Sequence, residues 1–191
     1  KSIGNYAFLQ SQFSSITFPD GLESIGDYAF RDSQFSSITF PSQLKSIGNY
    51  AFMDSQFSSI TFPDGLESIG PGAFLSSPLV SLTLPDSITS LGPYAFGDGN
   101  YNPPGSAHTL KTLHIGGGLT DFAFHQSGTI PTSPFWTYSA IEKVTFGEGV
   151  ESIGYGAFYN APIVSLSLPS TLVTINQQAF GESNIKTLVV P

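Results

Sequence analysis

The chain has 191 residues, of which 40% are hydrophobic and only 10% are charged, and it contains no cysteine. This composition excludes a disordered acidic tail, a disulfide framework and cysteine-based chemistry. The formal net charge of −8 repels a phosphate backbone, so we expect no nucleic-acid partner, and the chain has no apolar run approaching the roughly 18 residues of a transmembrane segment.

A repeat of 22 residues starts near the beginning of the chain. The block Gln12–Pro19 returns as Gln34–Pro41 and Gln56–Pro63, and Pro78–Pro85 is a divergent copy. The apolar residue in the middle of the block continues at spacings of 22, 22, 22, 31, 31, 22 and 22 residues, as Ile16, Ile38, Ile60, Leu82, Leu113, Val144, Leu166 and Leu188. Such fixed self-similarity is typical of a solenoid in which each unit packs against its neighbours.

The first unit predicts the local structure of the others. Residues 15–18 alternate polar and apolar side chains and end at Pro19, which is typical of a short strand with a stop. Asp20 and Gly21 supply a turn, and residues 28–30 predict a compact helical or 3₁₀ turn that leads to the next strand. We therefore expect a right-handed repeat solenoid, with a parallel β-sheet on one face and short turns or 3₁₀ segments on the other.

We expect six apolar columns to run through the core of this solenoid. One column is aromatic, with tryptophan at one position: Phe8, Phe30, Phe52, Phe74, Phe96, Trp136, Phe158 and Phe180. Two others begin with phenylalanine and become mostly aliphatic: Phe13, Phe35, Phe57, Leu79, Leu110, Ile141, Ile163 and Ile185, and Phe18, Phe40, Phe62, Leu84, Ile115, Phe146, Leu168 and Val190. The aromatic content is thereby explained as core packing, and no cofactor is predicted.

Residues 1–191 are interpreted as one solenoid segment of about eight coils, with nine extra residues in each of two consecutive units. These insertions fall near residues 97–109 and 123–135. The chain opens inside a unit and closes straight after a predicted strand, without the polar caps that repeat arrays need. We expect the segment to be part of a longer protein, or to have its ends covered by neighbours.

The pattern Leu-x-x-Ile-x-Phe-Pro-x-x-Leu-x-x-Ile-Gly-x-x-Ala-Phe, as carried by residues 35–52, resembles the BspA-like leucine-rich repeat family over essentially the whole chain. The resemblance implies a leucine-rich-repeat solenoid that serves cell-surface adhesion and protein binding, not catalysis. One departure is a small residue three positions after the aromatic column, which is often cysteine in that family. It is Ser11, Ser33, Ser55, Ser77, Gly99, Ala161 or Ser183 here.

The predicted strands expose a row of hydroxyl groups that is a candidate ligand-binding surface. The row runs through Thr39, Thr61 and Thr83 and reaches His114 in the next unit. One interpretation is a solvated sheet face that owes its threonines to strand propensity. The others are a flat, uncharged hydrogen-bonding surface for a protein or glycan ligand, and a match to a crystalline lattice such as ice.

The two insertions supply the other candidate ligand-binding residues, because long loops on a rigid scaffold often carry binding sites. We expect them to bring Tyr101, His108, His125 and Tyr138 near one edge of the solenoid. The alternative is that the insertions are tolerated loop growth and bind no ligand. No histidine pair has metal-ligand spacing, so neither a metal site nor a catalytic residue is predicted. Residues 98–102 resemble the first ligand positions of a calcium-binding loop, but Pro103 stands where such a loop requires glycine. Asp121 lies four residues before His125, which is only a weak indication of an acid–base pair.

These features predict a non-enzymatic protein-binding or adhesion array of an extracellular or cell-surface protein. The alternative is a structural building block whose coils stack end to end into a filament or larger assembly. An enzyme is the third class, but no nucleophile and base stand at a recognisable spacing.

Overall fold

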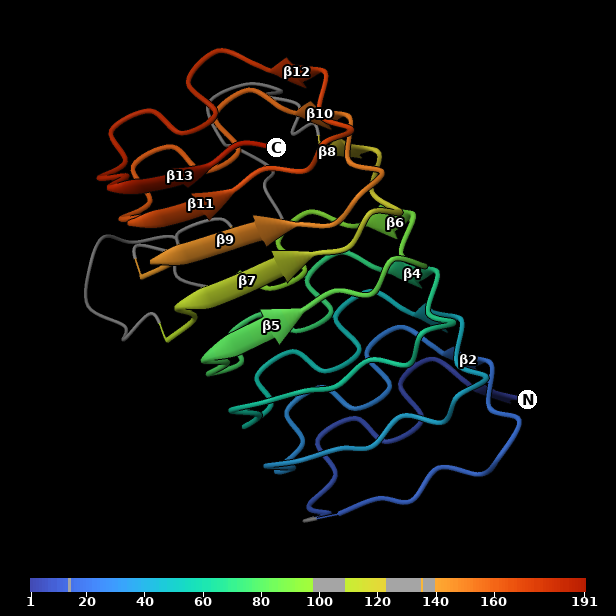
Figure 1. Ribbon diagram of the computed structural model, residues 1–191. Coiled ribbons are helices and arrows are strands. Elements are labelled where there is room, and N and C mark those ends of the chain that lie inside the picture. The colour runs from blue at the N-terminus through green and yellow to red at the C-terminus, as the bar shows by residue number, and fades with distance from the viewer. Residues whose placement is uncertain (14, 98–108, 123–134, 136–139) are drawn as a thin grey trace.

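The computed structural model describes residues 1–13, 15–97, 109–122, 135 and 140–191, with the side chains of residues 121 and 122 left out. These residues form a stack of coils in which thirteen short strands make three parallel sheets (Figure 1). The described residues contain no helix, and so none that could cross a bilayer. The predicted leucine-rich solenoid, with parallel strands and short turns, is confirmed.

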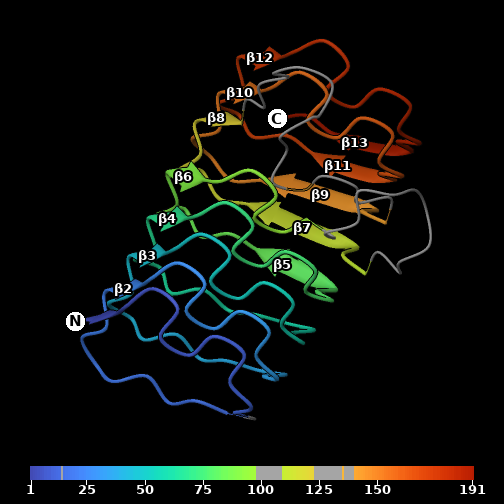
Figure 2. The same ribbon diagram turned by 180° about the vertical axis from the view of Figure 1, so that it is seen from behind.

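The first sheet, named here the serine sheet, lies on one side of the N-terminal coils (Figure 2). Its strands, in spatial order, are β1 (Ser2–Ile3), β2 (Ser24–Ile25), β3 (Ser46–Ile47), β4 (Ser68–Ile69) and β6 (Ser90–Leu91). Each strand pairs with the residue 22 positions on, as Ser24 does with Ser46. The sequence did not predict these strands, although Ser-Ile-Gly recurs in the first four units and Ser-Leu-Gly follows in the fifth, at residues 90–92.

The second sheet, named here the long sheet, is the predicted one, and it forms only from the fourth coil onward. Its strands, in spatial order, are β13 (Thr187–Val189), β11 (Ser165–Ser167), β9 (Lys143–Phe146), β7 (Thr112–Ile115) and β5 (Ser81–Thr83). The pairing of Leu82 with Leu113, and of Leu113 with Val144, confirms the alignment across the two longer units. A third sheet continues the position of the serine sheet with β12 (Thr174–Ile175), β10 (Ser152–Ile153) and β8 (Asp121–Phe122).

The strand prediction is wrong for residues 15–18, 37–40 and 59–62, which form no ladder beyond one isolated bridge between Thr39 and Thr61. The phenylalanine columns explain this difference. Neighbouring rings are 6.4–6.5 Å apart along the Phe13 column and 5.9–6.0 Å apart along the Phe18 column. Paired strands lie only about 4.7–4.9 Å apart, so these stacked rings hold the coils too far apart for a ladder. The long strands form from Ser81 onward, where leucine, isoleucine or valine replaces most of these phenylalanines and Phe146 pairs with Ile115.

The predicted helical or 3₁₀ turns are instead a run of hydrogen-bonded turns that join each coil to the next. In the first coil the N–H groups of Tyr6, Phe8 and Gln10 donate to carbonyl oxygens of the second coil, each at 2.8 Å. The intervening N–H groups bond within the coil, as Ala7 does to the Gly4 carbonyl at 3.4 Å. Tyr6 and Gln10 adopt φ angles of 58° and 57°, and the same alternation recurs in later coils. Backbone groups on this side are therefore paired between neighbours rather than along a helix.

The aromatic column forms the centre of the core. The rings of Phe30, Phe52, Phe74 and Phe96 stack at 5.3 Å with nearly parallel planes, and all four are fully buried. The next ring in the stack belongs to Phe135, whose centroid is 5.7 Å from that of Phe96. The alignment that placed Trp136 at this step of the column is therefore corrected by one residue. Trp136 itself lies outside the described residues.

Candidate binding surfaces

The threonine row is defined as Thr17, Thr39, Thr61, Thr83, His114, Thr145 and Ser167. It begins on the coils without a ladder and continues on the strands of the second sheet. Thr39 bridges to Thr61, and Thr83 pairs with His114 in the register of β5 and β7. Thr39, Thr61 and Thr83 are exposed, whereas His114 is half-buried. The structure thus brings these four predicted residues onto one surface, and their role as ligand contacts stays a prediction.

His114 makes the one side-chain hydrogen bond seen along the described part of this row. Its Nδ1 lies 2.9 Å from the Oγ1 of Thr145 on the neighbouring strand. No group of three or more histidine, aspartate or glutamate side chains among the described residues could hold a metal ion. The chemistry on offer at this row is hydrogen bonding by hydroxyl and imidazole groups.

The insertion residues Tyr101, His108, His125 and Tyr138 lie outside the described residues, as does the calcium-like run 98–102. Asp121 begins strand β8, but its side chain and that of His125 are not described. Whether the two insertions lie side by side and bind a ligand stays a prediction.

A groove of about 320 Å³ runs over the serine sheet, and the sequence did not predict it. Its lining includes the strand residues Ser46 and Ser68, the glycines Gly48 and Gly70, and Asp27. A Cβ atom on Gly48 would lie 2.7 Å from the backbone nitrogen of Asp27, so glycine permits this close approach of neighbouring coils. The signal that could have revealed the groove is the recurrent Ser-Ile-Gly, which places side-chain-free positions in register.

A ladder of side-chain oxygens closes one edge of this groove. The Asn5 Oδ1 accepts a hydrogen bond from the Asp27 backbone at 2.8 Å, and the Asp27 Oδ1 accepts one from the Asn49 backbone at 2.7 Å. An aromatic stack lies next to this ladder along the chain. The rings of Tyr6 and Tyr28 are 5.0 Å apart, and those of Tyr28 and Tyr50 are 5.1 Å apart.

The small-residue position that departs from the family pattern is a column of buried hydroxyl groups. Ser33 and Ser55 are fully buried and Ser77 nearly so, and their Oγ atoms have no hydrogen-bond partner. An unpaired buried hydroxyl loses hydration without compensation, so this column is a source of instability rather than a binding site.

Neighbouring groups or burial shift the pKa values of three charged side chains among the described residues. The hydrogen bond that Lys45 donates to the Glu67 carboxylate, together with the charge of Glu67, raises the pKa of Lys45. The hydroxyl and backbone N–H of Ser170 lower the pKa of Glu148. Burial, followed by the nearby charge of Asp32, raises the pKa of Asp54.

The stacked coils, the parallel sheets and the leucine-rich columns together define a leucine-rich-repeat solenoid, which is a non-enzymatic repeat scaffold. A family model for the BspA type leucine rich repeat region matches six copies over residues 1–102 and 118–191. The chain belongs to this family. A comparison with the sequences of curated proteins finds no match.

Solved structures show the same fold. The pneumococcal vaccine antigen PcpA is 27% identical, with a TM-score of 0.54, and the match covers 98% of this chain and 56% of the antigen. The leucine-rich repeat protein TpLRR of T. pallidum is 24% identical, with a TM-score of 0.61 and coverage of 83% and 69%. A leucine-rich repeat protein of Bacteroides ovatus is 20% identical, with a TM-score of 0.55 and coverage of 91% and 48%. The chain thus spans about half the length of the first and third of these proteins.

Proposed function

We propose that the chain is a non-enzymatic binding array whose ligand, a protein or a glycan, rests on the threonine row. The observation that carries this proposal is the continuity of the row, in which Thr39, Thr61, Thr83 and His114 lie on one face over a rigid stack. Leucine-rich repeat proteins bind proteins generally, and a regular row of polar side chains on a rigid scaffold suits an extended surface contact.

We also propose that the array works in adhesion at a cell surface or outside the cell. Support comes from the likeness to a pneumococcal vaccine antigen over 98% of this chain.

The test is a comparison of two triple-lysine variants against a panel of purified extracellular matrix proteins and a glycan array. Thr39→Lys, Thr61→Lys and Thr83→Lys together place three large cations on the row. The control, Gln12→Lys, Gln34→Lys and Gln56→Lys, adds the same charge at exposed positions with the same spacing. We expect the first variant alone to lose the ligand that the unmodified chain binds. Equal loss in both variants, or no ligand for the unmodified chain, would contradict the proposal.

The second candidate is a building block that stacks end to end. It is favoured by strand β13, which pairs on one side only and whose Leu188 and Val189 are 54% and 53% exposed. An unpaired strand edge with apolar side chains is a template for another chain. Light scattering at increasing protein concentration separates the candidates, because a building block grows in mass and a ligand-binding monomer does not.

A further inference from the structure

The outward face of the long sheet carries one lysine and no acidic side chain. Its residues alternate with buried ones such as Leu113 and Val144, and its five strands lie side by side (Figure 1). Two rows of side chains cross these strands in register: Ser81, Thr112, Lys143, Ser165 and Thr187, and then Thr83, His114, Thr145, Ser167 and Val189. The face therefore consists mainly of hydroxyl groups around one ammonium and one imidazole group.

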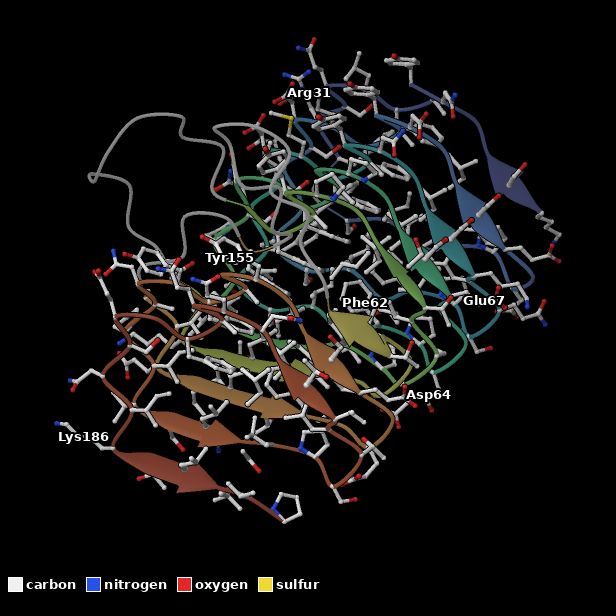
Figure 3. All side chains as sticks on the ribbon, turned by 90° about the horizontal axis from the view of Figure 1, so that it is seen from above. Arg31, Phe62, Asp64, Glu67, Tyr155 and Lys186 are labelled. Carbon is white, nitrogen blue, oxygen red and sulfur yellow. The ribbon has the colours of Figure 1, made fainter. Side chains whose placement is uncertain are left out.

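The ammonium group of Lys143 is available to a ligand. The other cationic groups of the chain, apart from Lys186, each lie within 3.7 Å of a carboxylate: the amino terminus of Lys1, Arg31, Lys45 and Lys111. Lys143 is exposed on the central strand β9 and forms no ion pair with any residue that the structure describes. The adjacent Glu142 binds Lys111 at 3.1 Å. Lys186 lies beside the start of β13, far from Arg31 and Glu67 (Figure 3).

His114 adds a fixed hydrogen-bonding group on the strand next to Lys143. Its Nδ1 lies 2.9 Å from the Oγ1 of Thr145, and this contact orients the ring. When the Thr145 hydroxyl donates this bond, the imidazole proton is on Nε2 and can be donated to a ligand. Paired strands are about 4.8 Å apart and alternate residues of a strand about 6.7 Å apart, so His114 and Lys143 are diagonal neighbours at about 8 Å. One carboxylate can contact both side chains.

The chemistry of this face restricts the class of ligand. One free cation suits one carboxylate, whereas a net charge of −8 repels a polymer with a charge on every unit. Hydroxyl groups both donate and accept hydrogen bonds, as sugar hydroxyls do. A protein partner is usually held by aromatic or other large side chains in well-packed pockets. The two rows offer such a partner one apolar side chain, Val189 on the last strand.

From this charge and hydroxyl pattern we propose that the long sheet binds a glycan in which a sugar carboxylate stands among neutral sugars. The carboxylate pairs with the Lys143 ammonium group and accepts a hydrogen bond from His114, and the flanking sugar hydroxyls bond to Thr112 and Ser165. This inference deepens the proposed function and rests on it, because His114 and Thr145 belong to the threonine row.

Two fluorescent oligosaccharides serve as probes, one ending in glucuronic acid and one in sialic acid, and anisotropy with the full chain reports their binding. Each is compared with its neutral twin, in which the carboxylate is reduced to an alcohol. We expect an acidic probe to bind, and its neutral twin to bind about fivefold more weakly. A polysaccharide with a sulfate group on every sugar should not displace the probe at physiological salt. Failure of both acidic probes to bind, or equal binding of the neutral twins, would overturn the proposal.

Substitutions locate the contact on the sheet. Lys143→Gln should weaken binding of the acidic probe by about fivefold, whereas Lys143→Arg keeps the charge and should retain binding. Lys186→Gln is the matched control, because it removes the other unpaired cation two strands away and should leave binding unchanged. Thr112→Val removes a hydroxyl beside Lys143 with little change in size and should weaken binding by about threefold. Thr174→Val, exposed on the third sheet, should not.

The outcomes separate this proposal from the proposed function. A ligand that is lost in the triple-lysine variant of the threonine row but kept by Lys143→Gln would overturn the carboxylate contact and leave the proposed function standing. An acidic probe that depends on Lys143 but is kept by the triple-lysine variant would do the reverse. Equal weakening by Lys143→Gln and Lys186→Gln, or displacement of the probe by a glutamate–serine peptide, would also overturn the carboxylate-sugar site. Circular dichroism and thermal melting of each variant show that the fold is retained.

Discussion

The ring of Phe135 stacks on that of Phe96 with their centroids 5.7 Å apart and their planes 8° from parallel. The two residues are 39 positions apart in the chain, yet they are consecutive steps of the aromatic column. The column thus stays continuous across a unit that carries an insertion, because a buried ring gains more from stacking than the loop loses in entropy.

Replacing Phe135 by alanine should therefore break the core between the two halves of the array. We expect a loss of about 3–5 kcal/mol in the free energy of unfolding, since the side chain is only 4% exposed. Urea denaturation followed by circular dichroism measures it. Phe13→Ala is the matched control, because that ring is 43% exposed and its loss should be much smaller. Similar losses in both variants would contradict this placement of Phe135.

The coils without a ladder on the threonine-row face should form one when their phenylalanines are reduced in size. Phe35→Leu, Phe57→Leu, Phe40→Leu and Phe62→Leu together reproduce the aliphatic residues of the later coils, so residues 37–40 and 59–62 should join the long sheet. Slower amide hydrogen exchange at Thr39 and Thr61 is the expected readout, by about tenfold or more. Unchanged exchange in a folded variant would show that ring size does not hold the coils apart.

The buried hydroxyl of Ser55 should be dispensable for stability. Ser55→Ala removes a fully buried Oγ without a partner, and we expect it to raise the free energy of unfolding by about 1–2 kcal/mol. Ser55→Cys should do the same, because a thiol tolerates apolar surroundings. Ser59→Ala, at an exposed position, should change it by less than about 0.5 kcal/mol. A loss of stability in Ser55→Ala would mean that this hydroxyl has a partner in solution.

Gly117 should not tolerate any side chain. An added Cβ would sit 1.6 Å from the Glu148 carbonyl oxygen, which belongs to the backbone of the next coil and has little room to move. Gly117→Ala should therefore destabilise the array by about 2–4 kcal/mol. Gly4→Ala is the control, because nothing lies within 4 Å of the added carbon. Melting curves of the two variants that coincide would contradict the close packing of these coils.

The carboxyl group of Asp54 should make stability depend on pH. Its pKa is raised by burial and then by Asp32, so the folded state holds the proton more tightly than the unfolded state does. The stabilisation by this proton is complete below the unfolded pKa and is lost as pH rises through the folded pKa. Asp54→Asn should thus be more stable than the unmodified chain at pH 7, and the difference should vanish as pH falls below about 4.

Urea midpoints at pH 7, 5 and 3 check this prediction. Asp64→Asn, at an exposed aspartate, serves as the control and should follow the unmodified chain at each pH. An Asp54→Asn variant that is less stable than the unmodified chain at pH 7 would mean that the bond to Ser76 and the charge of Arg31 outweigh burial.

The sequence by itself determined the period, the parallel stack and nearly all of the core. A spacing of 22 residues puts Leu82 over Ile60, and the same alignment carried across the two longer units pairs Leu82 with Leu113 and Leu113 with Val144. Such columns can be read directly because each coil contacts only its neighbours. The threonine row follows from the same register, which is why its described members lie on one face.

Only the tertiary structure decided which side of each N-terminal coil forms a β-ladder with its neighbours. Both the Ser15–Phe18 and the Ser24–Gly26 segments could make a strand, and the choice depends on the spacing that stacked rings impose on one side and that glycines such as Gly48 allow on the other. That balance also completed the ladder of the serine sheet and left the groove over it. It likewise selected Phe135 over Trp136, because an insertion leaves the register of the next aromatic ring to packing rather than to spacing.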